Sequence, residues 1–397
     1  MTNIIPKMLV YMQEDRLVFK GGPFAVGYCY YHEMKRRGEN TLSFLPPNKI
    51  QSESEHNKDA DTSKQHSFMF SVYQYLRVYL WYVFKFFKAK PRHNIFDNFD
   101  IIHFHSTQEL FLERENLKHF KGKVILQSHS PMPLGDELYD LTEFKPKWLI
   151  PFFKCNLRRM DRYAFLRADY IIFPCEEAEE PYLNRWKEYK KIRDQKKRSY
   201  RYVLTGIPQV EPKRQRQAVL DELHLNEDCF LISYAGRHNE AKGYDILKQI
   251  GAEFLKENNE AVIVVAGKEY PITRLKHDRW IELGWTDDAK SYISASDVFI
   301  LPNRETYFDL VMIEVLSLGK IIVASRTGGN RFFEKNNCPG VFLYNTKEEC
   351  ISILKRISGM TKEEKDTLGQ KNKEFYLKYL TVSAMYDSYI SMISSIE

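Results

Sequence analysis

Residues 229–269 read CFLISYAGRHNEAKGYDILKQIGAEFLKENNEAVIVVAGKE, and this stretch decides the fold. It begins with an apolar run, CFLISYAGR, that ends in a polar loop. An amphipathic pattern, YDILKQIGAEFLKEN, follows, and a second apolar run, AVIVVAGKE, completes the unit. Two buried strands joined by a helix of this length predict a βαβ unit, in which both strands run parallel in one sheet.

The same alternation continues through the second half and recurs in the first. After residue 269 the apolar runs are WIELGWT, VFILPN and KIIVAS, and they alternate with the helical patterns AKSYISASD and FDLVMIEVLSLG. The strands expected in the first half are MLVYM, TLSFLP, DIIHFHS, KVILQSHS and YIIFPCEE. The chain is therefore predicted to be an α/β protein built on parallel sheets.

Chain length and proline positions predict two domains. A chain of 397 residues exceeds what one hydrophobic core usually supports. Pro208 and Pro212 interrupt regular structure in TGIPQVEPKR, so we place an N-terminal domain at 1–204 and a C-terminal domain at 205–381. In parallel sheets the ligand crevice lies beyond the carboxyl ends of the strands, which nominates HFHS, QSHS, AGRHNEAKG and LPNRETYFD as the site.

The charge of the chain does not indicate nucleic-acid binding. The formal net charge is only +6, and no arginine-rich arm, zinc-finger spacing or RRM signature accompanies it. The basic excess is local and lies in residues 185–216. Two interpretations of this tract stay open: a solvated helix face, or a surface that meets anionic lipid headgroups or a pyrophosphate-linked acceptor.

A second segment with a membrane-related alternative is 68–88, FMFSVYQYLRVYLWYVFKFFK, which Arg77 and Lys85 interrupt. It is interpreted as a buried or half-buried helix, or alternatively as an interfacial helix rich in Trp and Tyr. The six scattered cysteines form no metal-ligand pattern, and the N-terminus lacks the apolar run of a signal peptide. We therefore expect a cytoplasmic protein, located at the inner face of the membrane if these segments bind lipid.

The second half resembles family 4 of the glycosyltransferases through the blocks SYAGRHNEAKGYDIL, AVIVVAGKE and WIELGWTDDAKSYISASDVFILPNRETYFDLVMIEVLSLGKIIVASRTGG. The first half matches more loosely, through KGGPFAVGY, DIIHFHS, VILQSHS and ADYIIFPCEE. This family contains retaining enzymes with the GT-B fold. The resemblance implies two Rossmann-like parallel-sheet domains facing a central cleft, with the acceptor bound by the first and the nucleotide-sugar donor by the second. It also implies a last helix, 382–397, that crosses back to the first domain.

Three residues of the second half carry the donor chemistry that the resemblance implies. Arg237 and Lys242 flank a loop after a strand end. The matching Arg and Lys of the family bind the donor diphosphate, where cations stabilise the charge of the leaving group. Glu314 matches a glutamate of the family that binds the ribose hydroxyls, and an ionised carboxylate can accept hydrogen bonds from both of them. The alternatives are plain surface cations and an ordinary helix carboxylate.

The start of the helix that carries Glu314 is a further expected donor contact. Free backbone N–H groups are expected at Asp309, Leu310 and Val311, and a helix N-terminus is a ready anion site.

The sequence departs from the family just before this helix. Thr306 stands where the family has a glutamate that touches the donor sugar, and Asp309 stands where it has a glycine. Thr306, Asp309 or the displaced Glu305 would take over that contact. The resemblance therefore does not identify the donor sugar.

The resemblance also nominates residues of the first half. Gly21 and Gly22 follow the first strand, and in the family this loop passes beside the donor phosphates and the acceptor; a simple turn is the alternative. His129 ends VILQSHS and matches a family histidine that faces the transferred sugar. His103 and His105 end DIIHFHS, where family members often carry histidine. For each histidine, a satisfied place in the core is the alternative.

The resemblance implies a retaining transfer without a protein nucleophile, in which the acceptor attacks on the face that the leaving diphosphate departs from. No cofactor and no essential metal are expected, and the DxD triplet at Asp59–Asp61 is interpreted as a coincidence in a polar tract. The predicted function is transfer of a hexose from a nucleotide sugar to a glycan or lipid-linked oligosaccharide in cell-surface polysaccharide synthesis. The alternatives are a non-catalytic nucleotide-sugar-binding GT-B protein and a GT-B sugar-nucleotide epimerase.

Overall fold

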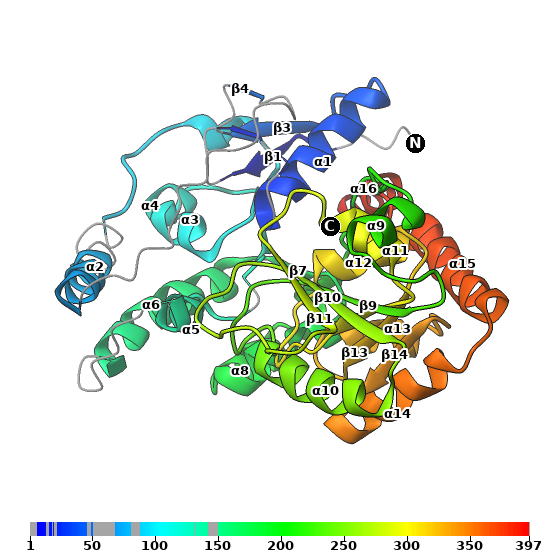
Figure 1. The fold of residues 1–397 in the computed structure, drawn as a ribbon. Coiled ribbons are helices and arrows are strands. Elements are labelled where there is room, and N and C mark those ends of the chain that lie inside the picture. The colour runs from blue at the N-terminus through cyan, green and yellow to red at the C-terminus, as the bar shows by residue number, and fades with distance from the viewer. Residues whose placement is uncertain are drawn as a thin grey trace. The chain divides into compact units, whose positions relative to one another are not determined.

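The computed structural model describes residues 6–12, 16–17, 19, 22–45, 49–50, 68–80, 88–130, 132–141 and 150–396. They form two compact units (Figure 1). Unit 1 comprises Met1–Phe173, Pro181–Val203 and Tyr386–Glu397, and unit 2 comprises Pro174–Glu180 and Leu204–Met385. Neither unit is one continuous stretch of chain.

Unit 2 is built on a parallel sheet of six described strands in the order β11-β10-β9-β12-β13-β14. The first strand of the unit therefore lies inside the sheet; the next two strands lie on one side of it and the last three on the other. This is the strand order of a doubly wound dinucleotide-binding fold. The strands are β9 (Phe230–Ala235), β10 (Ala261–Ala266), β11 (Trp280–Gly284), β12 (Val298–Leu301), β13 (Ile321–Ser325) and β14 (Val341–Tyr344).

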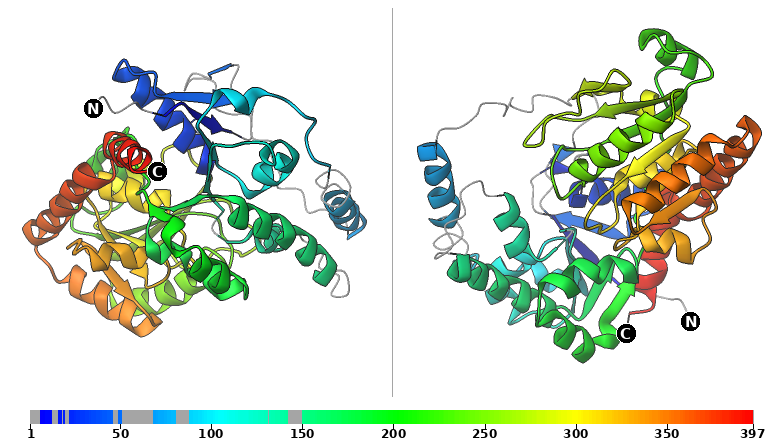
Figure 2. Two further views of the ribbon diagram at one scale, coloured as in Figure 1. Left: turned by 180° about the vertical axis from the view of Figure 1, so that it is seen from behind. Right: turned by 60° about the horizontal axis from the view of Figure 1, so that its bottom comes forward.

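Helices cover both faces of this sheet (Figures 1 and 2). Alternate residues of β10 point to opposite faces: Ile263 packs with α10 and α14, whereas Val262 and Val264 pack with α9 and α11. Strands buried on both faces read as continuous apolar runs, which explains the sequence AVIVVA. The helices are α9 (Arg216–Glu222), α10 (Tyr244–Glu257), α11 (Ala289–Ala295), α12 (Leu310–Ser317), α13 (Asn330–Lys335), α14 (Lys347–Ser358) and α15 (Lys362–Tyr379).

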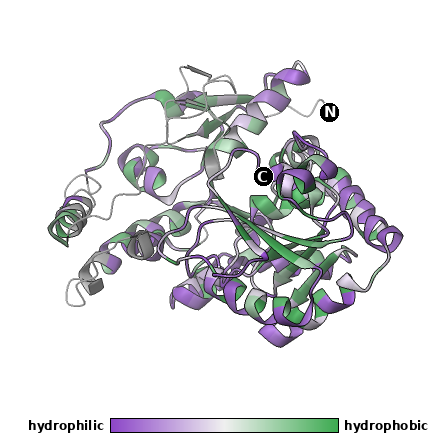
Figure 3. Ribbon diagram, in the orientation of Figure 1, coloured by the Kyte–Doolittle hydropathy of each residue, from purple (hydrophilic) through white to green (hydrophobic). Residues whose placement is uncertain are grey.

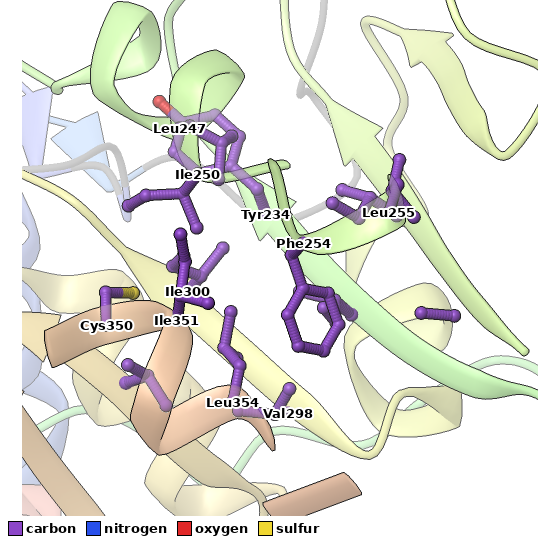
Figure 4. Packing of buried hydrophobic residues seen from close by; sticks show 14 of the residues in the cluster. Tyr234, Leu247, Ile250, Phe254, Leu255, Val298, Ile300, Cys350, Ile351 and Leu354 are labelled. Atoms are coloured by element: carbon purple, nitrogen blue, oxygen red, sulfur yellow. The ribbon is translucent and has the colours of Figure 1, made fainter. Parts of the chain in front are cut away.

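Hydropathy follows this layering, because the strands of unit 2 are hydrophobic while α10, α14 and α15 carry hydrophilic residues on their outer sides (Figure 3). Figure 4 shows the larger core from close by. There the side chains of α10 and α14 meet those of the central strands. The labelled residues are Tyr234, Leu247, Ile250, Phe254, Leu255, Val298, Ile300, Cys350, Ile351 and Leu354.

Unit 1 carries a second parallel sheet of six described strands, in the order β3-β1-β5-β6-β7-β8. A short pair, β2 (Arg16–Leu17) and β4 (Lys49–Ile50), lies outside it. The strands are β1 (Met8–Tyr11), β3 (Leu42–Leu45), β5 (Ile101–Phe104), β6 (Lys123–Gln127), β7 (Tyr170–Phe173) and β8 (Tyr200–Tyr202). The predicted α/β class with two parallel sheets is confirmed.

The helices of residues 22–199 are short apart from α1, α2 and α6. Helix α1 ends close to Gly38, whose φ of +71° is the left-handed conformation that commonly follows a helix. The α-helices are α1 (Gly22–Arg36), α2 (Phe68–Leu80), α3 (Thr107–Leu112), α4 (Arg114–Leu117), α5 (Leu134–Leu141), α6 (Ile150–Arg167), α7 (Glu180–Arg185) and α8 (Tyr189–Gln195). The 3₁₀ segments are η3 (Ile95–Asn98), η4 (Glu176–Glu179) and η5 (Lys197–Ser199).

The last helix, α16 (Val382–Ser394), is divided between the units, since Tyr386–Glu397 belong to unit 1. The ring of Tyr389 stacks on Tyr30 of α1 at 4.3 Å between centroids. Its hydroxyl lies 2.5 Å from Nδ1 of His103, at the end of β5. All three side chains are fully buried. The end of α16 is thus part of the core of unit 1.

The two segments with a predicted membrane contact differ in structure. In α2 the side chains of Met69 and Tyr73 are 76% and 59% exposed, so the helix is not fully buried, and the half-buried and interfacial interpretations both stay predictions. Residues 81–87 lie outside the described ones. None of the described helices has the length and apolar character needed to cross a membrane.

The basic tract 185–216 contains both solvated and paired cations. Lys190 and Lys191 are exposed on α8, whose buried face is formed by Tyr189 and Ile192. Further along, Arg214 pairs with Asp288 and Glu222. Lys190 and Lys191 are therefore solvated cations, while Arg214 is a structural residue of unit 2.

Candidate functional site

The switch point of unit 2 lies between β9 and β12, where the chain leaves neighbouring strands in opposite directions. Doubly wound folds bind ligands beyond the carboxyl ends of the strands at this point. The loop after β9 contains Arg237 and Lys242, and the loop after β12 contains Thr306 and Asp309. The topology therefore brings together the two predicted loops of the donor site.

Glycines allow these loops to pack backbone against backbone. Gly243 has φ +63°, and a Cβ there would lie 1.8 Å from the carbonyl oxygen of Pro302. Gly328, in the loop after β13, has φ +42°, and a Cβ would lie 1.8 Å from the carbonyl oxygen of Thr306. Any larger residue would force the backbones apart. The loop 302–309 is thus packed between the loop after β9, which ends at Gly243, and the loop after β13, which contains Gly328.

An ion pair also joins the first two loops. Arg304 donates to Asp245 through two hydrogen bonds of 2.7 and 2.6 Å, and its backbone N–H donates to the carbonyl of Ala241 at 3.2 Å. These bonds hold loop 302–309 against loop 236–243 and against the first turn of α10, which contains Asp245.

Lys242 forms an ion pair with an aspartate in this structure. Its Nζ donates to Oδ1 and Oδ2 of Asp309 at 2.9 and 3.0 Å. The side-chain amide of Asn303 also donates to Asp309 Oδ2, and the Oδ1 atom of Asn303 is buried with no hydrogen-bond partner among the described residues. Asn303 lies in the nominated LPNRE segment, but nothing in the sequence connects it to Asp309.

Arg237 follows β9 directly and is exposed. Its guanidinium makes no ion pair with the described residues, so its charge remains available to a ligand. Its carbonyl oxygen accepts hydrogen bonds from the Tyr234 hydroxyl at 3.1 Å and from the N–H of Asn239 at 2.9 Å. The backbone of the residue is therefore fixed while the cationic side chain faces solvent.

Helix α12 begins at Leu310, with Asp309 as its N-cap residue, two residues after the Phe308 at which the sequence pattern FDLVMIEVLSLG begins. The first N–H groups of a helix lack partners within it, which leaves those of Leu310 and Val311 as candidate anion contacts. The Asp309 side chain makes no capping hydrogen bond. Asp309 therefore takes part in the site through its carboxylate.

Glu314 lies further along α12, half-buried, with its Oε1 3.6 Å from Nζ of Lys290. Burial raises the pKa of Glu314, and Lys290 offsets part of this effect. Lys290 is on α11 and was missed by the sequence analysis, because nothing in AKSYISASD places it beside α12. The pair gives a ligand at this end of the sheet both an acceptor and a cation.

Thr306 is buried inside the packed loops. Its hydroxyl lies 3.1 Å from that of Thr327, and its carbonyl accepts the N–H of Gly329 at 3.2 Å. This side chain is engaged within the protein. Glu305 is partly exposed beside it.

In unit 1 three histidines gather beyond β5 and β6. Nδ1 of His105 lies 2.8 Å from Nε2 of His129, and the two rings stack at 5.0 Å between centroids. The ring of His103 lies 4.2 Å from that of His105 between centroids, tilted by 37°, and Nδ1 of His103 contacts the Tyr389 hydroxyl. Burial lowers the pKa of His129 to about 3 and holds those of His103 and His105 well below the usual value. All three rings are therefore neutral at physiological pH.

Within unit 2 the structure thus brings Lys242 together with Asp309 and Asn303, and Glu314 together with Lys290; within unit 1 it places His129 beside His105. The assignment of His129 to the transferred sugar stays a prediction. Gly22 is the first residue of α1, and Gly21 lies outside the described residues, as do Asp59–Asp61. Within the described ranges, no three His, Cys, Asp or Glu side chains are arranged to hold a metal ion.

Comparisons with known proteins concern the same part of the chain. Residues 229–357 match the family model described as Glycosyl transferases group 1. A glycogen synthase of Bacillus licheniformis is 30% identical over 131 residues, which are 30% of this chain and 27% of that protein. The UDP-Gal:alpha-D-GlcNAc-diphosphoundecaprenol alpha-1,3-galactosyltransferase of Escherichia coli is 28% identical over 149 residues, 34% of this chain and 38% of that protein. The chain thus spans well under half the length of either relative.

Among solved structures, HepE of Anabaena in complex with UDP-glucose has a TM-score of 0.63 and 13% identity, covering 98% of this chain and 100% of that chain. At 13% identity this similarity shows only that the two chains share a fold. That fold is GT-B, as predicted. The chain therefore has the GT-B fold, and its residues 229–357 match the family of glycosyl transferases group 1.

Proposed function

We propose that the protein is a retaining glycosyltransferase of the family 4 type, which transfers a hexose from a nucleotide sugar to a glycan or lipid-linked acceptor in cell-surface polysaccharide synthesis. The observation that carries this proposal is the position of Arg237 and Lys242. Both follow β9 at the switch point of unit 2, inside the matched residues 229–357. Two cations at the ligand end of such a sheet suit the diphosphate of a nucleotide sugar.

In the proposed reaction unit 2 supplies charge and orientation rather than a nucleophile. Arg237 and Lys242 stabilise the negative charge that develops on the leaving diphosphate, and the N–H groups at the start of α12 add further donors. Glu314 accepts hydrogen bonds from the ribose hydroxyls. The acceptor hydroxyl attacks the sugar on the face from which the diphosphate leaves, a phosphate oxygen takes its proton, and the configuration is retained. We propose that this step needs neither a metal ion nor a cofactor.

The donor and acceptor classes are supported by the relatives. The solved HepE complex contains UDP-glucose, and the name of the Escherichia coli relative describes a UDP-galactose donor and a diphosphoundecaprenol-linked acceptor. We propose donors and acceptors of these classes here, and a cytoplasmic location, where nucleotide sugars are made.

Thermal-shift measurements with UDP, GDP and ADP, and with their common sugar conjugates, test the proposal directly. One nucleotide family at a hundred times its Kd should raise Tm by roughly 5–10 °C, because ligand binding to the folded state adds about 2.7 kcal/mol at that concentration. UDP is the first candidate, and EDTA should leave the shift unchanged. If no nucleotide raises Tm, the donor-site assignment is wrong. A shift that EDTA removes and Mn²⁺ restores would contradict the metal-independent step.

A non-catalytic binding protein is a second candidate, and the buried, engaged Thr306 is the observation that favours it. The two candidates differ in turnover. Release of free sugar or transfer to an acceptor, measured by chromatography of radiolabelled donor, would exclude the binding-only function.

We further propose peripheral membrane contact through unit 1. Residues 68–93 contain five Lys or Arg and no Asp or Glu, so the segment is suited to an anionic surface. Four exposed apolar residues of α2 recur at intervals of three or four, which aligns them on one side of the helix. They are Met69, Tyr73, Leu76 and Leu80.

Liposome sedimentation checks this contact. The protein should sediment with anionic vesicles in low salt and remain in solution at 1 M salt, where the Debye length falls to about 3 Å. Replacing Met69, Tyr73 and Leu76 by serine should abolish sedimentation, whereas Leu183→Ser, an exposed leucine of α7, should leave it unchanged. Equal sedimentation of both variants would show that α2 does not bind the membrane.

A further inference from the structure

The carboxylate that holds Lys242 occupies the position of an anionic ligand. A lysine proposed to bind a diphosphate is already bonded to both oxygens of Asp309, at 2.9 and 3.0 Å. Both side chains are partly exposed, 29% for Lys242 and 21% for Asp309, so a ligand can reach the pair. A diphosphate that approaches Lys242 must therefore compete with a resident anion.

The local backbone shows that Asp309 is not there to cap its helix. An aspartate at an N-cap ordinarily accepts an N–H of the first turn through its side chain. Asp309 makes no such bond, and its carboxylate is held instead by Lys242 and by the side-chain amide of Asn303. The Asp309 carboxylate therefore accepts none of the first N–H groups of α12, although it places a negative charge beside them.

The charge of Asp309 acts differently on the donor and on the product. A sugar diphosphate ester has one ionisable proton on each phosphate, whereas a free nucleoside diphosphate gains a further negative charge on its terminal phosphate above pH 6 or so. Like charges in close proximity repel, so Asp309 opposes the product more strongly than the donor. The donor also brings sugar hydroxyl groups, for which a carboxylate is a good acceptor.

Neighbouring groups support this second role. Thr306, the residue in the place of the family glutamate, is buried and hydrogen-bonded to Thr327. The carbonyl oxygen Oδ1 of Asn303 is buried without a partner in the described part of the chain, and its amide nitrogen donates to Asp309. Asn303 thus positions the Asp309 carboxylate, which is the acceptor next to the lysine.

On the basis of the proposed function, we propose that Asp309 determines the selectivity of this site for nucleotide sugar over free nucleoside diphosphate. In the free protein its carboxylate neutralises Lys242. When the donor binds, Lys242 turns to the diphosphate and Asp309 accepts hydrogen bonds from hydroxyl groups of the donor sugar. After transfer those hydroxyl groups leave with the product, the terminal phosphate gains charge, and the Lys242–Asp309 pair re-forms as the nucleotide dissociates.

The test compares two affinities in one variant. Asp309→Asn removes the charge and keeps an N-cap residue that helices favour, and Asp309→Ser is a second variant with the same property. Isothermal titration calorimetry would measure Kd for UDP and for UDP-glucose, or for the base that stabilises the wild-type protein. We expect Kd for UDP to fall roughly tenfold in both variants while Kd for UDP-glucose stays the same or rises, since one close charge pair changes affinity by this order.

Asp245→Asn is the matched control, because Asp245 also forms a two-bonded pair with a cation, Arg304, across the same loops. It should change both Kd values by the same factor. If Asp309→Asn also changes both equally, or weakens UDP, Asp309 has only a structural role and the inference is wrong. If the wild-type protein binds no nucleotide at all, the proposed function itself fails.

Discussion

Replacing Arg237 or Lys242 by alanine is expected to lower the rate of sugar transfer by roughly 10²–10³-fold, because removing one preorganised donor to a developing negative charge has an effect of this size. The fold of unit 2 should not change. The Arg237 side chain is exposed and forms no ion pair with the described residues, and Lys242 contacts Asp309 at the surface of the loops. The loss would thus fall on kcat and not on stability.

Single-turnover kinetics with radiolabelled donor would measure this effect, with circular dichroism to follow the fold. Lys248→Ala is the control, since Lys248 is a cation of the same unit whose Nζ donates to the carbonyl of Thr273 at 2.7 Å. Lys242→Ala also leaves the Asp309 carboxylate without its cation, so the double variant Lys242→Ala/Asp309→Asn is needed to separate the lost lysine from the uncompensated negative charge. A rate near that of the wild type in Arg237→Ala and in the double variant would overturn the diphosphate assignment.

The second large effect is expected at Glu314. Glu314→Gln should raise the KM for the nucleotide sugar by roughly 10–100-fold, because hydrogen bonds to a charged acceptor contribute about 1.5–3 kcal/mol. Since burial raises the pKa of Glu314, the ionised form is lost at a higher pH than for an exposed glutamate. Donor binding by the wild-type protein should therefore weaken as the pH is lowered through that raised pKa, and Glu314→Gln should lack this step.

Donor KM measured at several pH values would show both results. Glu253→Gln provides the control, as Glu253 pairs with Lys347 at 2.7 Å in the same unit but lies on α10. Unchanged donor kinetics in Glu314→Gln would remove this residue from the site.

Much of the fold could be predicted because its signals are local. Runs such as AVIVVA are buried on both faces of a sheet and therefore have no polar positions, so strands and helices could be recognised without tertiary information. The order of these elements then implied parallel sheets, and the ends of the strands implied where a ligand binds. Residues 174–180 show the limit, because their packing with unit 2 depends on contacts with distant residues, such as the hydrogen bond from the N–H of Gly328 to Glu180.

The details of the site depend on such distant contacts. Motif position was enough to nominate Lys242 and Asp309, but only their geometry shows that they neutralise each other. Lys290 approaches Glu314 from a different helix, and the spacing of the sequence contains no trace of this contact. For Arg237 the structure shows an exposed side chain on a backbone fixed by its own loop, and its role at the donor diphosphate stays a prediction from the motif.

The division of α16 between the units has a consequence for biosynthesis. Unit 1 contains residues 6–173 and also Tyr389, which fills the space between Tyr30 and His103. A nascent chain therefore cannot complete this core until the whole of unit 2 has been translated, a delay of roughly 10–40 s at ordinary elongation rates. During that time the place of the Tyr389 ring in the core of unit 1 is unfilled, and the apolar surface around it is exposed to aggregation.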